Sequence, residues 1–331
     1  MTSLREAARE LGLGRAALNY YHRPIGLLRQ SILEGGPFEQ RRTAAGHAKM
    51  IVAADNLPTL ADPVAGPEAK VAFVSGSKYW HQTAFCFVSL QLVSPFKITP
   101  VIFDDGTLTG QISAQLKRVI PWVQFVYADE VEERLDRMLP ERVFPTLRSR
   151  RRQYPHLRKL TDIHIASASF TLVLDSDMLF FRTPVELLEW FAAPHALYMQ
   201  DVLPAYGYPD AFLADLVGAP IPGLVNVGLY GLNGKTIGWD RIELWCRRQL
   251  EEYGTHYLQE QALTAMLFAG LQARPLSRTN YVVRPRLNEG RRPTAVLHHY
   301  VGTSKRSYFQ HGWKLVFESA SIACASSESV V

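Results

Sequence analysis

The chain of 331 residues contains little cysteine and no long apolar run. Its three cysteines, Cys86, Cys246 and Cys324, are scattered without the spacing of a metal site, which argues against a disulfide scaffold and favours a reducing cytoplasm. No apolar run approaches the ~20 residues that a membrane span needs, and the first residues lack the basic-then-apolar pattern of a signal peptide. We therefore expect a cytoplasmic protein, with peripheral contact at the inner face of a membrane left open.

Charge and composition set broad limits on the partners. The net charge of +5 favours polyanions such as nucleotide phosphates, anionic lipid or nucleic acid. The sequence has no nucleic-acid recognition motif, so we expect no nucleic-acid partner. With 47% hydrophobic residues, the chain can form one large α/β domain with attachments or two modest domains.

The first 67 residues differ in character from the rest and predict an N-terminal helical arm, residues 1–67. Helical patterns cover Leu4 to Tyr21, Ile25 to Leu33 and Phe38 to Ala54, with a break at Gly35-Gly36-Pro37. No helix here joins a strongly basic face to a large aromatic one, so packing on the core or homo-oligomerisation is favoured over membrane contact.

Residues 68–317 alternate between short apolar strands and helices. This alternation is typical of one α/β domain with a mostly parallel sheet that helices cover on both faces. Residues 318–331 are weakly apolar and rich in serine, and we expect a flexible tail there. Strands are predicted near 71–76, 98–103, 123–127, 170–174, 196–200, 225–233 and 295–300, and helices near 79–94, 109–119, 156–168, 184–191, 239–253 and 259–271.

The most informative stretch lies at residues 170–180. Residues 170–174 predict a buried strand, and Asp175 and Asp177 follow it directly. Both carboxylates share one face, because side chains alternate along an extended chain. Open α/β sheets bind ligands at strand ends, and two carboxylates crowded there are costly unless a cation lies between them. The pattern therefore predicts Mn²⁺ or Mg²⁺, which in turn binds phosphate oxygens.

This Asp-x-Asp pattern has two other interpretations. In phosphatases of the haloacid dehalogenase type it lies near the start of the chain, and a late paired-acid motif follows. Here it begins at Asp175, and no Gly-Asp-x-x-x-Asp follows. A plain acidic turn is disfavoured, because two unpaired charges at a buried strand end need a partner.

A second group of residues runs from His299 to Lys305. A histidine at a strand end can supply an imidazole as a third metal ligand. Gly302 lets the backbone come close to a phosphate, and Lys305 adds a positive charge for a diphosphate. With the two aspartates they would complete a metal–diphosphate cradle. His298 has the opposite alternation on its strand, so we assign it to packing.

Further motifs stand in a fixed order between about residue 70 and about residue 315. In this order they resemble a GT-A-fold glycosyltransferase, most closely the retaining group typified by glycosyltransferase family 8. The family's terminal Pro-Trp is replaced here by Arg306-Ser307. The matched motifs are Val74-Ser75-Gly76, Arg158-Lys159, Asp175-Ser176-Asp177, Asn226-Val227-Gly228, Glu260-Gln261 and His299 to Lys305.

The resemblance implies a single GT-A-like nucleotide-binding domain with hexosyltransferase activity. The donor would be a nucleotide-diphosphate sugar, with a UDP-sugar favoured, and the acceptor a hydroxyl of a sugar, glycolipid or other molecule, with retention at the anomeric carbon. The implied donor-binding residues are Val74, Ser75, Gly76, Arg158, Asp175, Ser176, Gly302 and Lys305, and the implied metal ligands are Asp175, Asp177 and His299.

Several polar residues have both a functional and a structural interpretation. Asp104 and Asp105 end the second strand, where they can contact ribose or uracil or form a plain turn with Gly106. Asn226 can contact sugar hydroxyls or satisfy backbone groups in a bulge, and Asp201 can face the sugar or the acceptor. The basic run 148–152 is interpreted as flexible and solvated, and contact with donor phosphates or anionic lipid is the less favoured interpretation.

The reaction can follow two routes that the sequence leaves open. In a front-face route, the leaving phosphate takes the proton of the acceptor. A double displacement needs a carboxylate on the opposite face, for which Asp201 and Glu260 are candidates, and Asn226 and Gln261 complete the candidate catalytic set. The alternative activity is that of a nucleotidyltransferase acting on a sugar phosphate, which needs a Gly-rich basic loop after the first strand. Residues 75–78 match such a loop only weakly.

Overall fold

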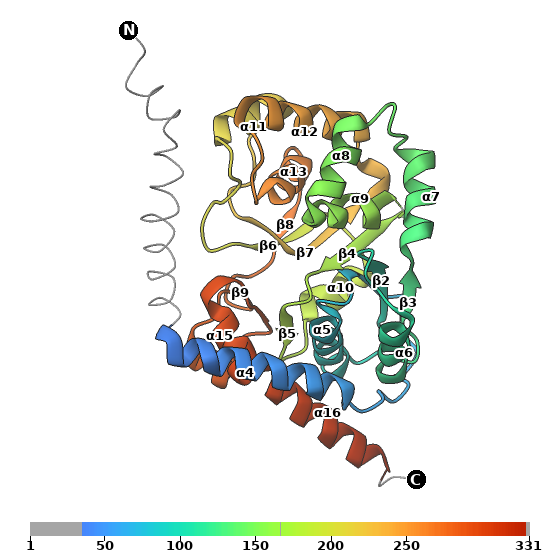
Figure 1. Cartoon of the computed structure of the whole chain (residues 1–331), viewed down its shortest axis with the longest axis vertical. Coiled ribbons are helices and arrows are strands. Elements are labelled where there is room, and N and C mark those ends of the chain that lie inside the picture. The colour runs from blue at the N-terminus through green and yellow to red at the C-terminus, as the bar shows by residue number, and fades with distance from the viewer. Residues whose placement is uncertain (1–34, 166, 329–331) are drawn as a thin grey trace, which may run out of the picture.

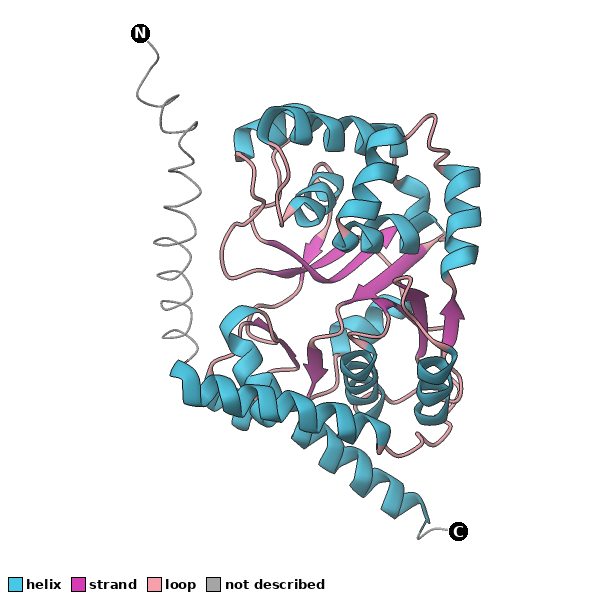
Figure 2. Ribbon diagram, in the orientation of Figure 1, coloured by secondary structure: helices cyan, strands magenta, loops and turns pink. Residues whose placement is uncertain are grey.

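The computed structural model describes residues 35–165 and 167–328. The helices predicted over Leu4 to Tyr21 and Ile25 to Leu33 lie outside these residues. A seven-stranded sheet carries helices on both faces, and a three-stranded sheet lies beside it (Figures 1 and 2). This architecture confirms the predicted α/β class with a mostly parallel sheet covered by helices. Within the described ranges, no helix has both the length and the apolar character needed to cross a membrane.

The large sheet has the strand order β3-β2-β1-β4-β7-β6-β8. β1 is parallel to β2 and β4, whereas β7 is antiparallel to both of its neighbours. Ser75 and Asp104 are register partners at the ends of β1 and β2, so these strands end at one edge. The strands are β1 Lys70–Ser75, β2 Thr99–Asp104, β3 Gln124–Val126, β4 Phe170–Leu174, β6 Leu197–Gln200, β7 Val225–Asn233 and β8 Arg274–Pro275.

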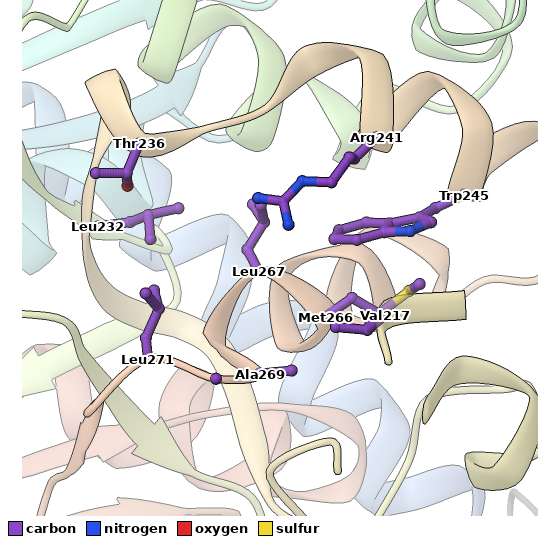
Figure 3. Close-up of a pocket in the computed structure, with 10 residues that line it drawn as sticks. Val217, Leu232, Thr236, Arg241, Trp245, Met266, Leu267, Ala269 and Leu271 are labelled. Carbon is purple, nitrogen blue, oxygen red and sulfur yellow. The ribbon is translucent and has the colours of Figure 1, made fainter. Parts of the chain in front are cut away.

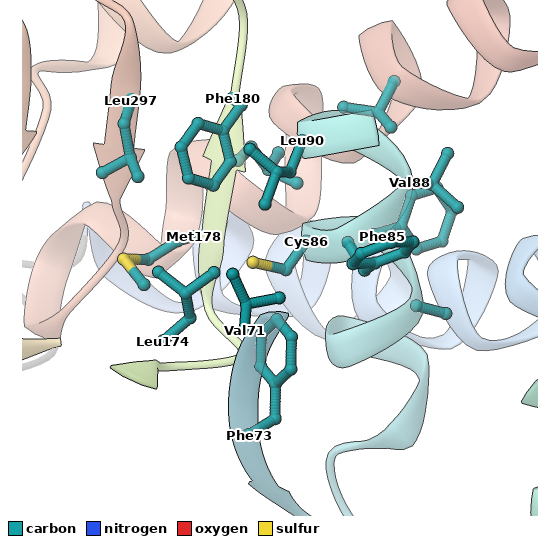
Figure 4. Close-up of a cluster of buried hydrophobic side chains, with 14 of the residues drawn as sticks. Val71, Phe73, Phe85, Cys86, Val88, Leu90, Leu174, Met178, Phe180 and Leu297 are labelled. Carbon is teal, nitrogen blue, oxygen red and sulfur yellow. The ribbon is translucent and has the colours of Figure 1, made fainter. Parts of the chain in front are cut away.

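Alternation along the strands divides the core into two layers. In β4, Leu172 and Leu174 join one hydrophobic cluster, part of which Figure 4 shows, and Val173 joins the other. The first cluster lies under α5 Trp80–Leu92, α6 Gly110–Val119 and α10 Val185–Ala192. The second lies under α7 Ala128–Met138, α8 Pro145–Gln153, α9 Arg158–Ile165, α11 Asp210–Val217, α12 Trp239–Tyr253 and α13 Gln259–Phe268.

The small sheet has the strand order β5-β10-β9 and begins directly after the two aspartates. Its strands are β5 Met178–Phe180, β9 Tyr281–Val283 and β10 Leu297–His299, and β10 is antiparallel to β5 and parallel to β9. The sequence predicted β10 but not β5 or β9, because three residues are too few to show a periodicity. The short helix α14 Leu287–Arg291 lies between β9 and β10 in the chain, and α15 Lys305–Ser307 follows β10.

The helices α4 Gly36–Asp55 and α16 Trp313–Glu328 lie on one side of the molecule (Figure 1). A Cβ atom on Gly46 of α4 would stand 2.2 Å from the Phe309 carbonyl oxygen, so glycine permits this close contact. Residues 318–328, predicted as a tail, continue α16 instead, because Val316 and Ala320 are buried against the core and hold the helix in place.

The basic run 148–152 lies in α8, and the predicted solvated run is wrong. Arg148 and Arg151 are buried. Arg151 Nε lies 2.6 Å from Asp162 Oδ1, and its Nη1 lies 2.6 Å from Glu132 Oε1. These buried charges are tolerated because they are paired. The acids that pair with them lie on other helices, so the basic run alone could not show that its arginines are buried.

Candidate functional site

The two aspartates of the Asp-x-Asp motif join the two sheets. The Asp175 N–H donates to the Gly228 carbonyl of β7 at 2.7 Å, which fixes this residue to the large sheet. The Asp177 carbonyl accepts from the Tyr300 N–H at 2.9 Å, which fixes this residue to the small sheet. One ligand atom each from Asp175, Asp177 and His299 lies within 4.8 Å of the others. The fold therefore brings together the three side chains that the sequence singles out as metal ligands.

The hydrogen bonds of Asn226 determine which nitrogen of His299 carries the proton. Asn226 Nδ2 lies 3.0 Å from Asp201 Oδ2, and a carboxylate only accepts, so this end must be the amide NH₂. Asn226 Oδ1 then accepts from the Gly228 N–H at 2.9 Å and faces His299 Nδ1 at 3.1 Å. His299 Nδ1 must be the donor, and Nε2 in the neutral ring keeps its lone pair.

Gly228 makes room for this ring. A Cβ atom at this position would stand 2.3 Å from His299 Cε1, closer than any side chain permits. The Asn226-Val227-Gly228 motif therefore has a local explanation: the amide orients the imidazole, and the glycine lets the imidazole approach β7. The functional interpretation of Asn226 as a direct sugar contact competes with this role, since both ends of its amide have protein partners.

The donor set fits a hard divalent cation. His299 Nε2 lies 3.3 Å from Asp177 Oδ1 and 3.7 Å from Asp175 Oδ2. This nitrogen is buried and has no hydrogen-bond partner among the described residues. Three electron-rich atoms converge, which is unfavourable unless a cation or proton lies among them. Two carboxylate oxygens and one imidazole nitrogen form a donor set that suits Mn²⁺ or Mg²⁺.

Lys159 places a buried ammonium against this cluster. Its Nζ donates to Asp175 Oδ1 at 2.8 Å and to the Val227 carbonyl at 3.1 Å, and it lies 3.6 Å from Glu260 Oε2. Burial alone would lower the pKa of Lys159, but the charges of Asp175 and Glu260 raise it above its usual range. Lys159 therefore stays charged and orients the first aspartate.

Arg158, the neighbour that the sequence favoured for donor binding, points elsewhere. Its Nη1 donates to the Asp105 carbonyl at the end of β2. Successive residues of a helix differ by 100° in direction, so the basic pair Arg158-Lys159 serves two different strand ends. The sequence showed the pair but not the rotation of α9 that selects Lys159.

Glu260 lies behind Lys159 and is only 3% exposed. Burial raises the pKa of Glu260 to about 7, Lys159 lowers it, and Asp175 adds a further upward shift. Its Oε1 has no hydrogen-bond partner among the described residues. A carboxyl group with a pKa near neutrality can exist in either the acid or the base form at physiological pH.

Asp201 and Gln261 form a polar layer beside Asn226. Asp201 Oδ1 accepts from the Val202 N–H at 2.7 Å, and its Oδ2 accepts from Asn226. Gln261 Nε2 donates to the Ala205 carbonyl at 2.8 Å and lies 3.5 Å from Asp201 Oδ2. Asp201, Asn226 and Gln261 therefore form one hydrogen-bonded group, and the fourth candidate, Glu260, joins the site through Lys159.

The end of β1 is tied to the Asp-x-Asp motif by hydroxyl groups. Ser75 Oγ and Thr83 Oγ1 are 2.7 Å apart, and Thr83 Oγ1 and Ser176 Oγ are also 2.7 Å apart. The next residue, Gly76, has no space for a side chain, because its Cβ would stand 1.9 Å from Asp105 Oδ1. Val74 precedes Ser75 and Gly76 in the chain and is partly buried. These residues form one tight edge beside the cluster.

The two aspartates that end β2 form turns. Asp104 Oδ1 accepts from the N–H groups of Gly106 at 2.7 Å and Leu108 at 2.9 Å. Asp105 Oδ1 accepts from the N–H and the hydroxyl of Thr107 at 3.0 and 2.5 Å. The turn interpretation therefore accounts for one oxygen of each carboxylate and leaves the other for a ligand.

Gly302 and Lys305 lie at the other side of the cluster. Gly302 has a φ of +57°, a left-handed conformation that favours glycine. Lys305 Nζ lies 3.2 Å from Asp177 Oδ2, and its side chain is 40% exposed. A cation bound to the carboxylates would compete for Asp177 and release this ammonium toward an incoming anion.

A cavity of about 230 Å³ opens elsewhere, at the far end of β7 (Figure 3). Arg241 and Trp245 of α12 and Leu267 of α13 are among its lining residues. It contains none of the residues that the sequence predicts as catalytic, donor-binding or metal-ligating, so the metal cluster and not this cavity is the candidate functional site.

No protein-family model matches the sequence, and a comparison with curated proteins gives no match. Among solved structures, apo mouse xyloside xylosyltransferase 1 matches with a TM-score of 0.48 and 13% identity, over 70% of this chain and 96% of that one. Galactosyltransferase LgtC in complex with donor and acceptor sugar analogues matches with a TM-score of 0.49 and 14% identity, over 76% and 95%. Glycosyltransferase GlyE of Streptococcus pneumoniae TIGR4 matches with a TM-score of 0.44 and 12% identity, over 76% and 63%. All three are glycosyltransferases, the class that the sequence resembles.

Proposed function

We propose that this chain is a metal-dependent glycosyltransferase that transfers a hexose from a nucleotide-diphosphate sugar, with a UDP-sugar favoured, to an acceptor hydroxyl. The carrying observation is the convergence of Asp175, Asp177 and His299 within 4.8 Å at the junction of the two sheets. The cluster adjoins the ends of β1 and β4, the edge at which α/β sheets bind nucleotides.

Different residues around the metal cluster would contact different parts of the donor. Ser75 and Gly76 form the edge at the end of β1, beside which the nucleoside would bind. Asp175, Asp177 and His299 would hold Mn²⁺ or Mg²⁺, which when bound supplies Lewis-acid neutralisation of the charge on the leaving diphosphate. Lys305, released from Asp177 when a cation binds, would contribute a further positive charge that stabilises the leaving diphosphate.

Two mechanisms can retain the configuration at the anomeric carbon, and only one of them requires a nucleophilic carboxylate from the protein. In the front-face route, the acceptor hydroxyl attacks C1 and the leaving phosphate takes its proton, so the protein supplies no base. A double displacement needs a nucleophilic carboxylate opposite the leaving group. Glu260 is buried beside Lys159, and Asp201 has hydrogen bonds to both oxygens, so each has a structural role already. These contacts favour the front-face route.

A product analysis tests the proposed function. The purified protein, incubated with a panel of nucleotide sugars and Mn²⁺, should release a nucleoside diphosphate, and the release should stop in excess chelator. A nucleotidyltransferase would instead form pyrophosphate from a sugar phosphate and a nucleoside triphosphate. Pyrophosphate formation, or nucleoside diphosphate release at an unchanged rate in chelator, would overturn the proposal.

A further inference from the structure

Arg284 has an unusual backbone conformation next to the metal cluster. Among the described residues it is the one non-glycine residue with a positive φ, at +57°. Amino acids with a Cβ atom avoid this left-handed region. The Arg284 N–H donates to the His299 carbonyl at 3.0 Å, directly after Val283, which is the register partner of His299 on β10. The strained residue is therefore anchored to the backbone of the predicted metal ligand.

The Arg284 side chain lies over the turn that precedes Lys305. Its Nε is 3.9 Å from the position that a Cβ atom on Gly302 would occupy. The residue is exposed, and no acidic side chain pairs with it in residues 35–165 and 167–328. Lys305, in contrast, lies 3.2 Å from an Asp177 oxygen. Arg284 therefore lies beside Gly302 in space, Lys305 follows Gly302 by three residues in the chain, and of these two cations only Arg284 lacks an acidic partner among the described residues.

The charges of the site leave room for this second cation. A divalent ion and Lys159 together would balance Asp175, Asp177 and Glu260, since Lys159 Nζ lies 2.8 Å from Asp175 Oδ1 and 3.6 Å from Glu260 Oε2. A diphosphate joined to both a nucleoside and a sugar carries two negative charges, and Lys305 offsets one of them. An unpaired arginine at the same turn offsets the other, and its planar guanidinium is well suited to phosphate oxygens.

We propose that Arg284 is a phosphate-binding residue whose guanidinium contacts the donor diphosphate across Gly302 from Lys305. The inference rests on the proposed function and adds a residue to it. The proposal also accounts for the positive φ of Arg284. Glycine would adopt this conformation without strain, so an arginine here is explained if binding by its side chain offsets the strain.

Calorimetry and thermal unfolding of the Arg284→Gly variant test the inference. Glycine relieves the strain, so the unfolding midpoint should equal or exceed that of the wild type. Binding of UDP in the presence of Mn²⁺ should weaken about tenfold, which corresponds to ~1.4 kcal/mol. Binding of uridine, which has no phosphate, should be unchanged. Arg284→Lys, which keeps a charge without the planar fork, should give an intermediate loss.

Lys305→Ala serves as the matched comparison, because it removes the other cation at the same turn. Both variants should lose UDP binding selectively, and only Arg284→Gly should keep or gain stability. Unchanged UDP binding in Arg284→Gly would overturn the inference, as would an equal loss for UDP and uridine. A lower unfolding midpoint in both Arg284→Gly and Arg284→Asn, a residue that also tolerates this conformation, would overturn the strain argument.

Pyrophosphate with Mn²⁺ separates this inference from the proposed donor. If the wild type binds pyrophosphate but not UDP, the uridine donor is wrong, and the Arg284 comparison is made with pyrophosphate. A dissociation constant for pyrophosphate that is the same in wild type and Arg284→Gly would then overturn the role of Arg284 alone.

Discussion

At the scale of single residues, His299 shows how much of the site depends on neighbours. Asn226 fixes its tautomer, Gly228 gives it space, and Asp201 fixes Asn226 in turn. Partners of this kind orient a metal-binding imidazole. The adjacent His298 is equally buried, but it faces Tyr300 at 3.1 Å and Glu289 at 3.2 Å. Two neighbouring histidines on one strand thus serve opposite faces of the small sheet.

This difference predicts opposite outcomes for two single substitutions. His299→Ala should weaken Mn²⁺ binding at least about tenfold, on the scale of changes in metal sites, and should leave most of the stability. His298→Ala leaves the buried Tyr300 hydroxyl and the Glu289 carboxylate without their partner, which costs about 1–3 kcal/mol, and should not affect the metal. Calorimetric titration with Mn²⁺ and urea unfolding of both variants provide the measurement.

The same two experiments contain their own control, since the variants differ by one position on one strand. A folded His298→Ala protein that no longer binds Mn²⁺, beside a His299→Ala protein that binds it normally, would mean that the strand register is off by one residue. The metal ligand would then be His298.

At the scale of elements, sequence reasoning succeeded where a pattern is local. Residues 170–174 and 225–233 were predicted as strands and form β4 and β7, because short strands rich in apolar residues and with clear ends need no distant information. It failed for the basic run in α8, because the acids that neutralise the run lie on other helices. Sequence reasoning also selected Arg158 and not Lys159 for donor binding, because only the packed structure fixes which side of α9 faces the metal cluster.

The contact between α4 and α15 is another long-range feature that the sequence did not reveal. Glu39 Oε2 lies 2.8 Å from Arg306 Nη2 and accepts from Gln310 Nε2 at 3.0 Å. Arg306 follows Lys305 directly, so α4 braces the short helix that carries the proposed diphosphate lysine. The N-terminal arm is thereby coupled to the site over the residues that the structure describes.

This brace leads to a prediction about donor affinity. Glu39→Gln keeps the size of the side chain but removes the charge that holds Arg306, so Lys305 should be less well positioned. UDP binding in Mn²⁺ should weaken by roughly two- to fivefold, a modest loss typical of partly exposed ion pairs, while uridine binding and the unfolding midpoint should change little. Calorimetry with both ligands measures the effect.

Arg42→Gln is the matched control for this prediction. Arg42 Nη1 lies 2.9 Å from Glu39 Oε1, but Arg42 is largely exposed, and the described residues show no ion pair between it and α15. Its loss should leave UDP binding unchanged. Equal effects of Glu39→Gln and Arg42→Gln on UDP binding would show that the general charge of α4 matters and not the brace.

At the scale of the whole molecule, buried ionisable groups link stability to pH. Burial lowers the pKa of His164 to about 3, and burial together with the charge of His47 lowers the pKa of His81 to about 4. Both values lie below the ordinary 6.5, so the fold favours the neutral rings. Their contribution to stability is complete above pH 6.5 and is lost as pH falls through the folded-state values. Glu260, with its pKa raised to about 7, acts in the opposite sense: its contribution is complete below pH 4.5 and is lost as pH rises toward 7.

Because these groups act together, only a comparison of variants isolates one of them. His164→Gln removes a ring that is 1% exposed, so it should destabilise the protein at pH 7 by leaving a poorly filled space. The difference in unfolding free energy between wild type and variant should shrink by up to about 1.4 kcal/mol per pH unit between pH 6.5 and 4.5. In this range the unfolded wild type binds a proton on His164 that the folded protein does not bind, and the variant has no such histidine. Tyr230→Phe removes the hydroxyl that lies 3.2 Å from His164 Nε2 but keeps the buried ring, so it should retain the pH slope of the wild type. Urea midpoints at three pH values give the result. Parallel curves for wild type and His164→Gln would show that His164 is protonated in the folded protein without cost, and that its burial does not control the acid stability of the fold.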